Sequence, residues 1–154
     1  PAPRIRRGDA RRVGPPPGTR LILTSPPYPG VYDYLPMQQL RLAWLGIEPG
    51  RDMARELGSR RQFRAEGRAR ALSRWRKDNA AWIGRQAEGL ERGGFFAIVV
   101  GDGLVGDRLV DALQPTVQAL EDAGVEVVAR ASADRPDHAR NTIRIEHLVL
   151  GRKG

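Results

Sequence analysis

Short apolar runs alternate with stretches of helical periodicity along this chain. Residues 21–23 form an apolar run bounded by turn-forming residues, and residues 95–100 form a longer one. Such runs are typical of strands buried in a parallel sheet. Residues 125–128 and 143–150 predict two further strands. A polar stretch of about residues 131–142 joins these two, so we expect an antiparallel hairpin at the edge of the sheet.

Apolar side chains recur at helical spacing between these strands. Residues 37–45 predict a short helix, which Gly46 ends. A firm helix is predicted from about residue 69 to residue 91, with one apolar face made by Leu72, Trp75, Asn79, Trp82, Ile83 and Leu90. The same spacing runs from residue 109 to residue 120, where Pro115 marks either a kink or a second helix start.

The order strand, helices, strand, helix, strand, strand predicts a single α/β domain. We expect a Rossmann-like, mostly parallel sheet with an antiparallel C-terminal hairpin, in which ligands bind at the C-terminal ends of the strands. Residues 1–20 are rich in Arg, Gly and Pro and predict a loop-rich N-terminal segment. Residues 51–92 predict a basic helical insertion, looser in its first half, which Gly93 and Gly94 end.

Composition narrows the chemistry open to this domain. The chain has 154 residues and no cysteine, which excludes disulfides, cysteine nucleophiles and thiolate-bound metal. His138 falls in a polar loop and His147 in an edge strand, and neither has a second ligand at metal spacing. We therefore expect structural histidines and no metal. No apolar run reaches about 18 residues and no signal-peptide pattern opens the chain, so we expect a soluble cytoplasmic protein.

The net charge of +8 is unevenly distributed. Residues 1–20 hold six Arg against one Asp, residues 51–92 hold twelve Lys and Arg against six acids, and residues 93–154 hold seven against nine. This distribution favours contact with a nucleic acid, in which Arg60, Arg61 and Arg64 would contact phosphates. Two alternatives explain the same charges without a nucleic acid: a genome that favours arginine over lysine, and a solvated helix face.

The segment Thr24-Ser25-Pro26-Pro27-Tyr28 follows the first predicted strand. The exocyclic amine of a base is a poor nucleophile, because its lone pair is delocalised into the ring. Two groups that accept hydrogen bonds from its N–H groups favour a tetrahedral nitrogen, whose lone pair then points along the line of attack on the methyl group. The Ser25 hydroxyl and the Pro26 carbonyl can be these acceptors, held in place by the Pro-Pro backbone. The Tyr28 ring can stack on an extruded base. A proline-rich linker explains the same residues without chemistry.

These residues resemble the Asp/Asn/Ser-Pro-Pro-Tyr motif of amino-group DNA methyltransferases, and serine at its first position is most similar to the N4-cytosine members. Further segments are similar to a group of bacterial DNA methylases: Gly8-Asp9-Ala10-Arg11, Tyr32-Asp33-Tyr34, and residues 40–46, 96–103 and 146–153. The resemblance covers most of the chain. It implies a class I methyltransferase sheet, S-adenosylmethionine as cofactor and DNA as substrate.

The resemblance also implies roles for individual residues. The motif residues would carry catalysis: Ser25, Pro26, Pro27 and Tyr28. The cofactor would be bound around the first strand by Asp9, Thr24 and Ser25. The target base would be held by Tyr28, Tyr32, Asp33 and Tyr34. A turn-forming role explains Asp9 equally well, and capping of the following helix explains Asp33 nearly as well.

One segment expected of such enzymes is missing. They bind the methionine part of the cofactor on a glycine-rich turn similar to Phe-x-Gly-x-Gly, which does not occur in this sequence. Gly101-Asp102-Gly103 is the nearest candidate, but a structural turn explains it better. The chain thus resembles the C-terminal catalytic half of a methyltransferase. We expect its cofactor-binding half upstream, in the same polypeptide or in a second chain.

Other functions stay compatible with the sequence. Adenine N6 demands the same acceptor geometry as cytosine N4, although the serine favours cytosine. Related Pro-Pro-Tyr motifs serve the methylation of RNA bases and of glutamine amides, and the arginine-rich surface favours nucleic acid over protein. A catalytically inactive nucleic-acid-binding module of the same fold would also lack the glycine-rich turn.

Overall fold

The computed structural model describes residues 2–48, 50, 52–105, 108–137 and 142–154. Four strands form one sheet in the order β1-β2-β6-β5: β1 Thr19–Thr24, β2 Leu90–Gly101, β5 Val125–Asp137 and β6 Thr142–Lys153. A separate two-stranded ribbon pairs β3 Gly103–Val105 with β4 Arg108–Val110. The helices are α1 Tyr34–Met37, α2 Gln39–Trp44, α3 Asp52–Arg55, α4 Arg60–Glu66, α5 Arg68–Ala87 and α6 Leu113–Asp122.

The sheet mixes parallel and antiparallel pairs. Strands β1 and β2 are parallel, whereas β6 is antiparallel to both of its neighbours, β2 and β5. Three of the four strands therefore point in one direction and β6 points in the other. The prediction of an α/β domain with an antiparallel C-terminal hairpin is confirmed. The expectation of a mostly parallel sheet holds for strand direction but not for pairing, since two of the three ladders are antiparallel.

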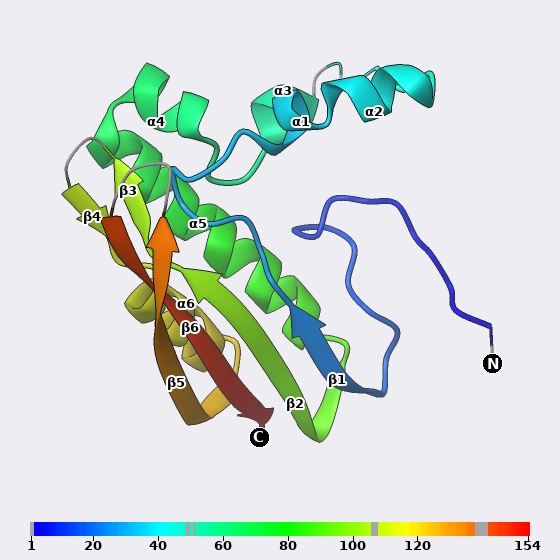
Figure 1. Ribbon diagram of the computed structural model, residues 1–154. Helices are drawn as coiled ribbons and strands as arrows, with labels where there is room; N and C mark the ends of the chain where they lie inside the picture. Colours follow the sequence, from blue (N-terminus) through cyan, green and yellow to red (C-terminus); the bar gives the residue numbers. More distant parts are fainter. Residues whose placement is uncertain (1, 49, 51, 106–107, 138–141) are drawn as a thin grey trace.

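Helices α5 and α6 cover one face of the sheet (Figure 1). Alternate residues of β2, among them Phe96, Ile98 and Val100, point to this face and are completely buried. The Trp82 ring of α5 packs edge-on against Phe96, with centroids 6.0 Å apart. This face carries the core of the described chain.

The opposite face of the sheet is open. Leu21 and Leu23 of β1 are exposed, as are Phe95 of β2 and Leu148 of β6. The prediction of a buried first strand is thus right only for Ile22, which packs partly against the core. The physical reason is that β1 is an edge strand, and only one of its faces meets a described helix.

Two predicted helix boundaries are wrong. The α5 helix ends at Ala87, and Leu90 begins β2, so Gly93 and Gly94 lie inside a strand instead of ending a helix. The chain reverses at Gly89, where a Cβ would lie only 2.6 Å from the Pro15 carbonyl oxygen. The close approach of the N-terminal segment therefore explains why a residue without a side chain occupies this turn.

The second wrong boundary is the start of α6. Residues 109 and 110 belong to β4, and the helix begins at Leu113, whose N–H donates to the Asp111 carboxylate over 2.8 Å. Pro115 lies in the first turn, where a missing N–H costs no intrahelical hydrogen bond. Pro115 thus marks the start of a single helix, so both alternatives, a kink and a second helix start, are wrong.

The C-terminal hairpin is longer than predicted. Strand β5 continues to Asp137, so the stretch from residue 131 to residue 137 is strand and not loop. His147 lies on β6, which runs between β2 and β5, so its predicted position on an edge strand is wrong. The side chain is buried and contacts Ser132 through Nδ1 at 2.8 Å and Asp102 through Nε2 at 3.3 Å. His138 lies outside the described residues.

Helices α1 to α4 lie beyond the C-terminal ends of β1 and β2 (Figure 1). The predicted helix over residues 37–45 is present as two short helices, α1 and α2, and Gly46 follows them with a φ of +63°. The looser first half of the basic insertion is present as α3 and α4. Gly58 and Gly67 flank α4 with φ values of +60° and +76°, which suit glycine. These helices bring the segment after the motif back toward the sheet.

Candidate functional site

The motif loop begins where β1 ends. Thr24 is the last residue of the strand and pairs with Ile98 of β2. The Ser25 side chain is exposed, the two prolines after it are half-buried, and Tyr28 is only 8% exposed. The loop therefore presents its serine to solvent and inserts its tyrosine into the protein.

Glycines at the end of β2 receive this loop. A Cβ on Gly101 would lie 2.6 Å from Cε2 of the Tyr28 ring, and a Cβ on Gly103 would overlap the Pro29 carbonyl. Asp102 between them accepts a hydrogen bond from the Ala112 N–H over 2.9 Å. These contacts favour the structural interpretation of Gly101-Asp102-Gly103, because both glycines are needed for close approach of the motif loop.

The Tyr28 side chain is held from the C-terminal hairpin. Its hydroxyl donates to Glu146 Oε1 over 2.6 Å, and the Arg135 guanidinium lies 5.2 Å from the ring centroid. Burial raises the pKa of the Tyr28 hydroxyl, and the contact with Glu146 adds to this, while a hydrogen bond with the Ser25 side chain acts in the opposite direction. Tyr28 is therefore a neutral phenol at physiological pH.

Two acidic residues, Asp33 and Glu56, have separate roles near the start of α1. Asp33 does not cap α1 with its side chain; instead it accepts from the Arg61 N–H over 2.9 Å. The α1 backbone is held by Glu56 Oε1, which accepts from the N–H groups of Tyr34 and Leu35. The helix-capping alternative for Asp33 is thus wrong, because Glu56 occupies that position.

Tyr32 and Tyr34 lie beside the motif loop. Their rings meet edge-on with centroids 5.4 Å apart. Tyr32 packs partly against the core, whereas Tyr34 is 36% exposed. The buried part of the Tyr34 side chain raises the pKa of its hydroxyl, which is hydrogen-bonded to the backbone of Tyr28. Tyr34 thus combines an accessible ring with a direct contact to the loop.

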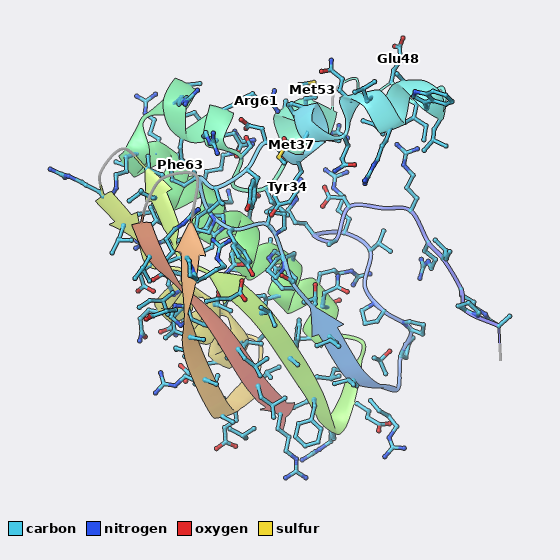
Figure 2. All side chains as sticks on the ribbon, viewed as in Figure 1. Tyr34, Met37, Glu48, Met53, Arg61 and Phe63 are labelled. Carbon is cyan, nitrogen blue, oxygen red and sulfur yellow. The ribbon has the colours of Figure 1, made fainter. Side chains whose placement is uncertain are left out.

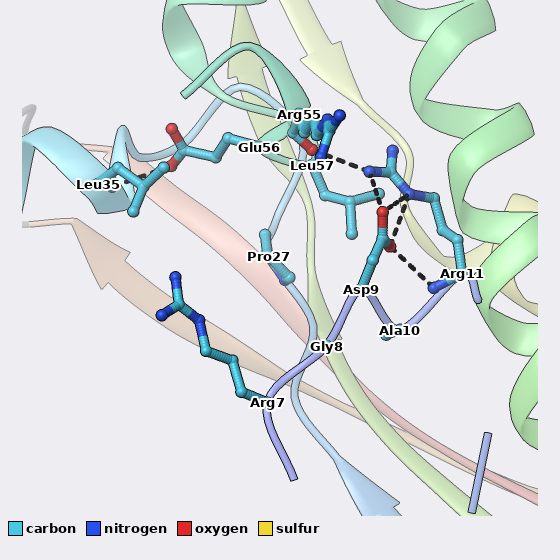
Figure 3. Close-up of a pocket in the computed structure, with 10 residues that line it drawn as sticks. All are labelled: Arg7, Gly8, Asp9, Ala10, Arg11, Pro27, Leu35, Arg55, Glu56 and Leu57. Atoms are coloured by element: carbon cyan, nitrogen blue, oxygen red, sulfur yellow. Dashed lines mark hydrogen bonds and ion pairs between the residues drawn. The ribbon is translucent and has the colours of Figure 1, made fainter. Parts of the chain in front are cut away.

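Asp9 lies across a cavity from the motif (Figure 3). The cavity has a volume of about 620 Å³ and is lined by residues 7–11, 55–57, Pro27 and Leu35. The Asp9 carboxylate accepts from the Arg11 backbone over 3.0 Å and from its Nε over 2.9 Å. Side-chain hydrogen bonds from Arg11 lower the pKa of Asp9. Asp9 therefore forms a turn, as one alternative proposed, and also borders a cavity that includes a motif residue.

The three candidate phosphate-binding arginines differ in their surroundings. Arg61 lies on the side of α4 that faces α1 and α3 (Figure 2) and pairs with Glu56 at 3.0 Å and Asp33 at 3.4 Å. Arg60 donates to the Val31 carbonyl over 2.7 Å. Arg64 is exposed. Arg60 and Arg61 thus fix the chain that follows the motif, and Arg64 is oriented toward solvent.

Three residues near the motif were missed by the sequence reasoning: Glu56, Arg135 and Glu146. Glu146 is 118 positions from its partner Tyr28, and Glu56 is 22 positions from Tyr34. Local patterns carry no signal at such distances.

Among the described residues, no helix is long and apolar enough to cross a membrane. No group of three or more His, Cys, Asp or Glu side chains in the same ranges is placed to hold a metal ion.

Comparisons with known proteins connect this geometry to a fold. No protein family model matches the chain, and no curated protein matches it in sequence. Solved structures do match: a "putative DNA modification methylase" from Thermus thermophilus aligns with 95% of this chain. Its complex with S-adenosyl-L-methionine gives a TM-score of 0.59 at 18% identity, and another structure of it gives 0.52 at 21%. The chain spans 53% and 52% of those structures. It therefore has the fold of about half of that methylase.

Proposed function

We propose that this chain is the catalytic half of a DNA methyltransferase that methylates an exocyclic amine of a base, with N4 of cytosine favoured and N6 of adenine as the alternative. The observation that carries the proposal is the placement of Ser25-Pro26-Pro27-Tyr28 at the C-terminal end of β1, beside the cavity that Asp9 borders. The likeness to half of a methylase supports it.

Ser25 and Pro26 would act directly on the amine. The exposed Ser25 hydroxyl and the Pro26 carbonyl accept hydrogen bonds from the two N–H groups of the amine. These hydrogen bonds localise the lone pair on the nitrogen. Pro27 restricts the loop before the substrate arrives. No rearrangement of the acceptors is then needed during the reaction, and this pre-organisation lowers the barrier.

The predicted stacking of a base on Tyr28 needs a modification. The Tyr28 ring is 8% exposed, packs on Gly101 and faces the Arg135 guanidinium. A base would have to displace Arg135 to stack there. We propose instead that Tyr34, with its accessible ring, offers the stacking surface, and that Tyr28 anchors the loop.

The cavity suits a small polar cofactor. Its volume of about 620 Å³ is in the range of ligand sites, and its wall carries the carboxylates of Asp9 and Glu56. S-adenosylmethionine would supply a methyl group bonded to a positively charged sulfur. Asp9 would bind it from this chain. Thr24 and Ser25, the other two predicted cofactor-binding residues, do not line this cavity and would reach the cofactor only at the end of β1. The complex of the Thermus protein with that cofactor supports this assignment.

A second half would complete the cofactor site. The sequence holds no glycine-rich turn of the expected kind, and β1 lies at one edge of the sheet with Leu21 and Leu23 exposed. An edge strand can accept a further strand through its free N–H and C=O groups. We propose that the cofactor-binding half adds to β1, from the same polypeptide or from a second chain.

DNA would approach on the side of the basic insertion. Arg64 and Arg70 are exposed there and can contact phosphates, whereas Arg61 is paired with acids. RNA bases are the alternative substrate. An inactive binding module is the alternative from another class, and the missing glycine-rich turn favours it.

A transfer assay tests the proposal. The chain, alone and together with its flanking gene region, is incubated with radiolabelled S-adenosylmethionine and either DNA or RNA. We expect label in DNA from the completed protein and a loss of about 10²-fold or more when Ser25→Ala and Pro26→Ala are combined. Ser73→Ala, an exposed serine on α5, is the matched control.

Each other outcome of the assay has its own meaning. Transfer that survives the double substitution contradicts the acceptor role of the Ser25 hydroxyl and the need for a proline that restricts the loop at residue 26. Label in RNA alone moves the substrate to RNA. Salt-dependent DNA binding without any transfer or cofactor binding identifies an inactive module.

A further inference from the structure

Three polar side chains form a series that leads away from the motif. The Ser25 side chain acts on the Tyr28 hydroxyl and lowers its pKa. The Tyr28 hydroxyl donates to Glu146 Oε1 over 2.6 Å. The Glu146 side chain is 37% exposed. The series thus begins at an exposed hydroxyl, crosses a buried phenol and ends at a carboxylate in contact with water.

The register of the sheet creates the space for this series. Glu146 pairs with Gly101 on β2 and with Ala133 on β5. Both neighbours have little or no side chain, so the Tyr28 ring can lie over the sheet next to Glu146. A Cβ on Gly101 would already come within 2.6 Å of the ring. The small residues on either side of Glu146 therefore allow its contact with the motif tyrosine.

Arg135 completes the surroundings of Glu146. Its Nε lies 3.8 Å from Glu146 Oε1, and its guanidinium lies over the Tyr28 ring. Among the described residues, the buried Nε and Nη2 atoms of Arg135 have no hydrogen-bond partner. Attraction to the carboxylate and to the ring face is what keeps this cation there. Arg135 thus places a positive charge beside the acceptor end of the series.

Methylation of an amine releases a proton that must leave the site. The nitrogen forms its new bond to carbon, the carbon–sulfur bond breaks, and the sulfur keeps the electron pair. The methylated amine is then positively charged and must lose one N–H proton to become neutral. No histidine lies in the motif loop, so another acceptor is needed.

We propose that Ser25, Tyr28 and Glu146 form a proton relay in which Glu146 is the terminal acceptor, an inference that rests on the proposed amine methylation. Ser25 Oγ takes the amine proton and passes its own proton to the Tyr28 oxygen, which passes its proton to Glu146 Oε1. Glu146 becomes a neutral carboxylic acid and later loses the proton to water. The serine and the tyrosine end the cycle neutral, as they began.

A purely structural role for the Tyr28–Glu146 contact makes different predictions. A structural contact would affect DNA binding and loop stability at every pH. A relay affects the chemical step and makes it depend on the charge of Glu146. Among the described residues, the titratable groups that face Glu146 are Tyr28 from the loop and Arg135 from β5, and Arg144 lies two positions away on β6.

The first test uses the chain itself and needs no activity. Ultraviolet absorbance follows tyrosine ionisation, and Tyr28→Phe assigns the Tyr28 contribution among the three tyrosines. We expect Glu146→Gln to lower the pKa of Tyr28, because a carboxylate beside the phenol opposes its ionisation. An unchanged Tyr28 pKa in Glu146→Gln would overturn the proposal, because the central link would be absent.

The second test uses the complete enzyme in single-turnover methyl transfer to DNA. Glu146→Gln should slow the chemical step by about 10²-fold with an unchanged KM for DNA, and the acid limb of the pH–rate profile should disappear. Tyr28→Phe keeps the ring and should slow the step similarly. Because both residues act in one series, the double variant should be no slower than the slower single variant. Glu126→Gln, an exposed glutamate on β5, is the matched control.

The outcomes separate the relay from the proposed function. Transfer at the wild-type rate by Glu146→Gln overturns the relay and leaves the function in place. A slower variant that keeps its acid limb, or a raised KM alone, also overturns the relay in favour of a structural contact. Absence of transfer by the wild-type enzyme overturns the proposed function and the relay with it.

Discussion

The two faces of the sheet present opposite surfaces. On the face that α5 and α6 cover, Trp82 is 4% exposed and Phe96 is completely buried. On the open face, Leu23 of β1 is 71% exposed. Trp44 of α2, which lies beyond the C-terminal ends of the strands, is 88% exposed. The covered face is a core that the described chain builds by itself. The open side has apolar side chains of the same kinds without partners, and such patches mark surfaces of interaction.

The motif loop lies at the border between these two regions. Ser25 continues from the exposed strand β1, whereas Tyr28 is packed on Gly101 and bonded to Glu146. The motif loop is thus anchored in the core and faces the open side. This placement suits the proposed site, which two halves would share.

The largest effect is expected from removing a core aromatic. Trp82→Ala should destabilise the chain by about 3–5 kcal/mol, because the ring is buried and its removal leaves a cavity against Phe96. Chemical denaturation followed by circular dichroism measures this loss. A change below about 1 kcal/mol would mean that the covered face is not a packed core.

A smaller effect is expected from the buried polar group in the same core. Asn79 accepts from the Trp82 indole over 2.9 Å and donates to Thr116 over 3.3 Å. Asn79→Ala leaves the indole N–H unsatisfied and should cost about 1–3 kcal/mol. The Thr116 hydroxyl keeps its own hydrogen bond to the Ala112 carbonyl in this variant, over 2.8 Å. A loss below about 0.5 kcal/mol would contradict the hydrogen bond between Asn79 and the indole.

A pH-dependent effect is expected at the cavity wall. Arg11 lowers the pKa of Asp9 in the folded chain, so Asp9 contributes stability above its unfolded pKa of about 3.9 and loses it as the pH falls through the lower folded value. Wild type should therefore exceed Asp9→Asn in unfolding free energy at neutral pH, and the difference should shrink below about pH 4.

Urea denaturation over a pH series measures this difference, with Asp134→Asn on exposed β5 as control. A gap between wild type and Asp9→Asn that grows on acidification would reverse the sign of the Asp9–Arg11 linkage and contradict it.

The smallest effect on the chain alone is expected at an exposed ring outside the core. Trp44→Ala should change the unfolding free energy by no more than about 0.5 kcal/mol, because the ring has almost no contacts to lose. The same measurement on Trp82→Ala gives the matched contrast of an exposed and a buried tryptophan. A loss of about 2 kcal/mol or more in Trp44→Ala would mean that α2 is part of the folded core.

The sequence predicted what depends on local periodicity and missed what depends on distant contacts. Strand β2, the C-terminal hairpin and α5 follow from runs and spacing that neighbouring residues determine. The end of α5 was misplaced, and the turn at Gly89 that follows it lies against Pro15, a contact between positions far apart in the chain. For the site, the motif residues were recognisable from their order alone. The roles of Glu56 and Glu146 depend on contacts across 22 and 118 positions, for which one sequence carries no signal.

The central claim is that the loop of Ser25 and Pro26 catalyses methylation of a base amine. Its most direct test is mass spectrometry of nucleosides from DNA incubated with S-adenosylmethionine and the completed protein. We predict N4-methylcytosine from the wild type and its loss in Ser25→Ala, with Ser73→Ala unaffected. DNA without any methylated amine, or an undiminished product from Ser25→Ala, would contradict the claim.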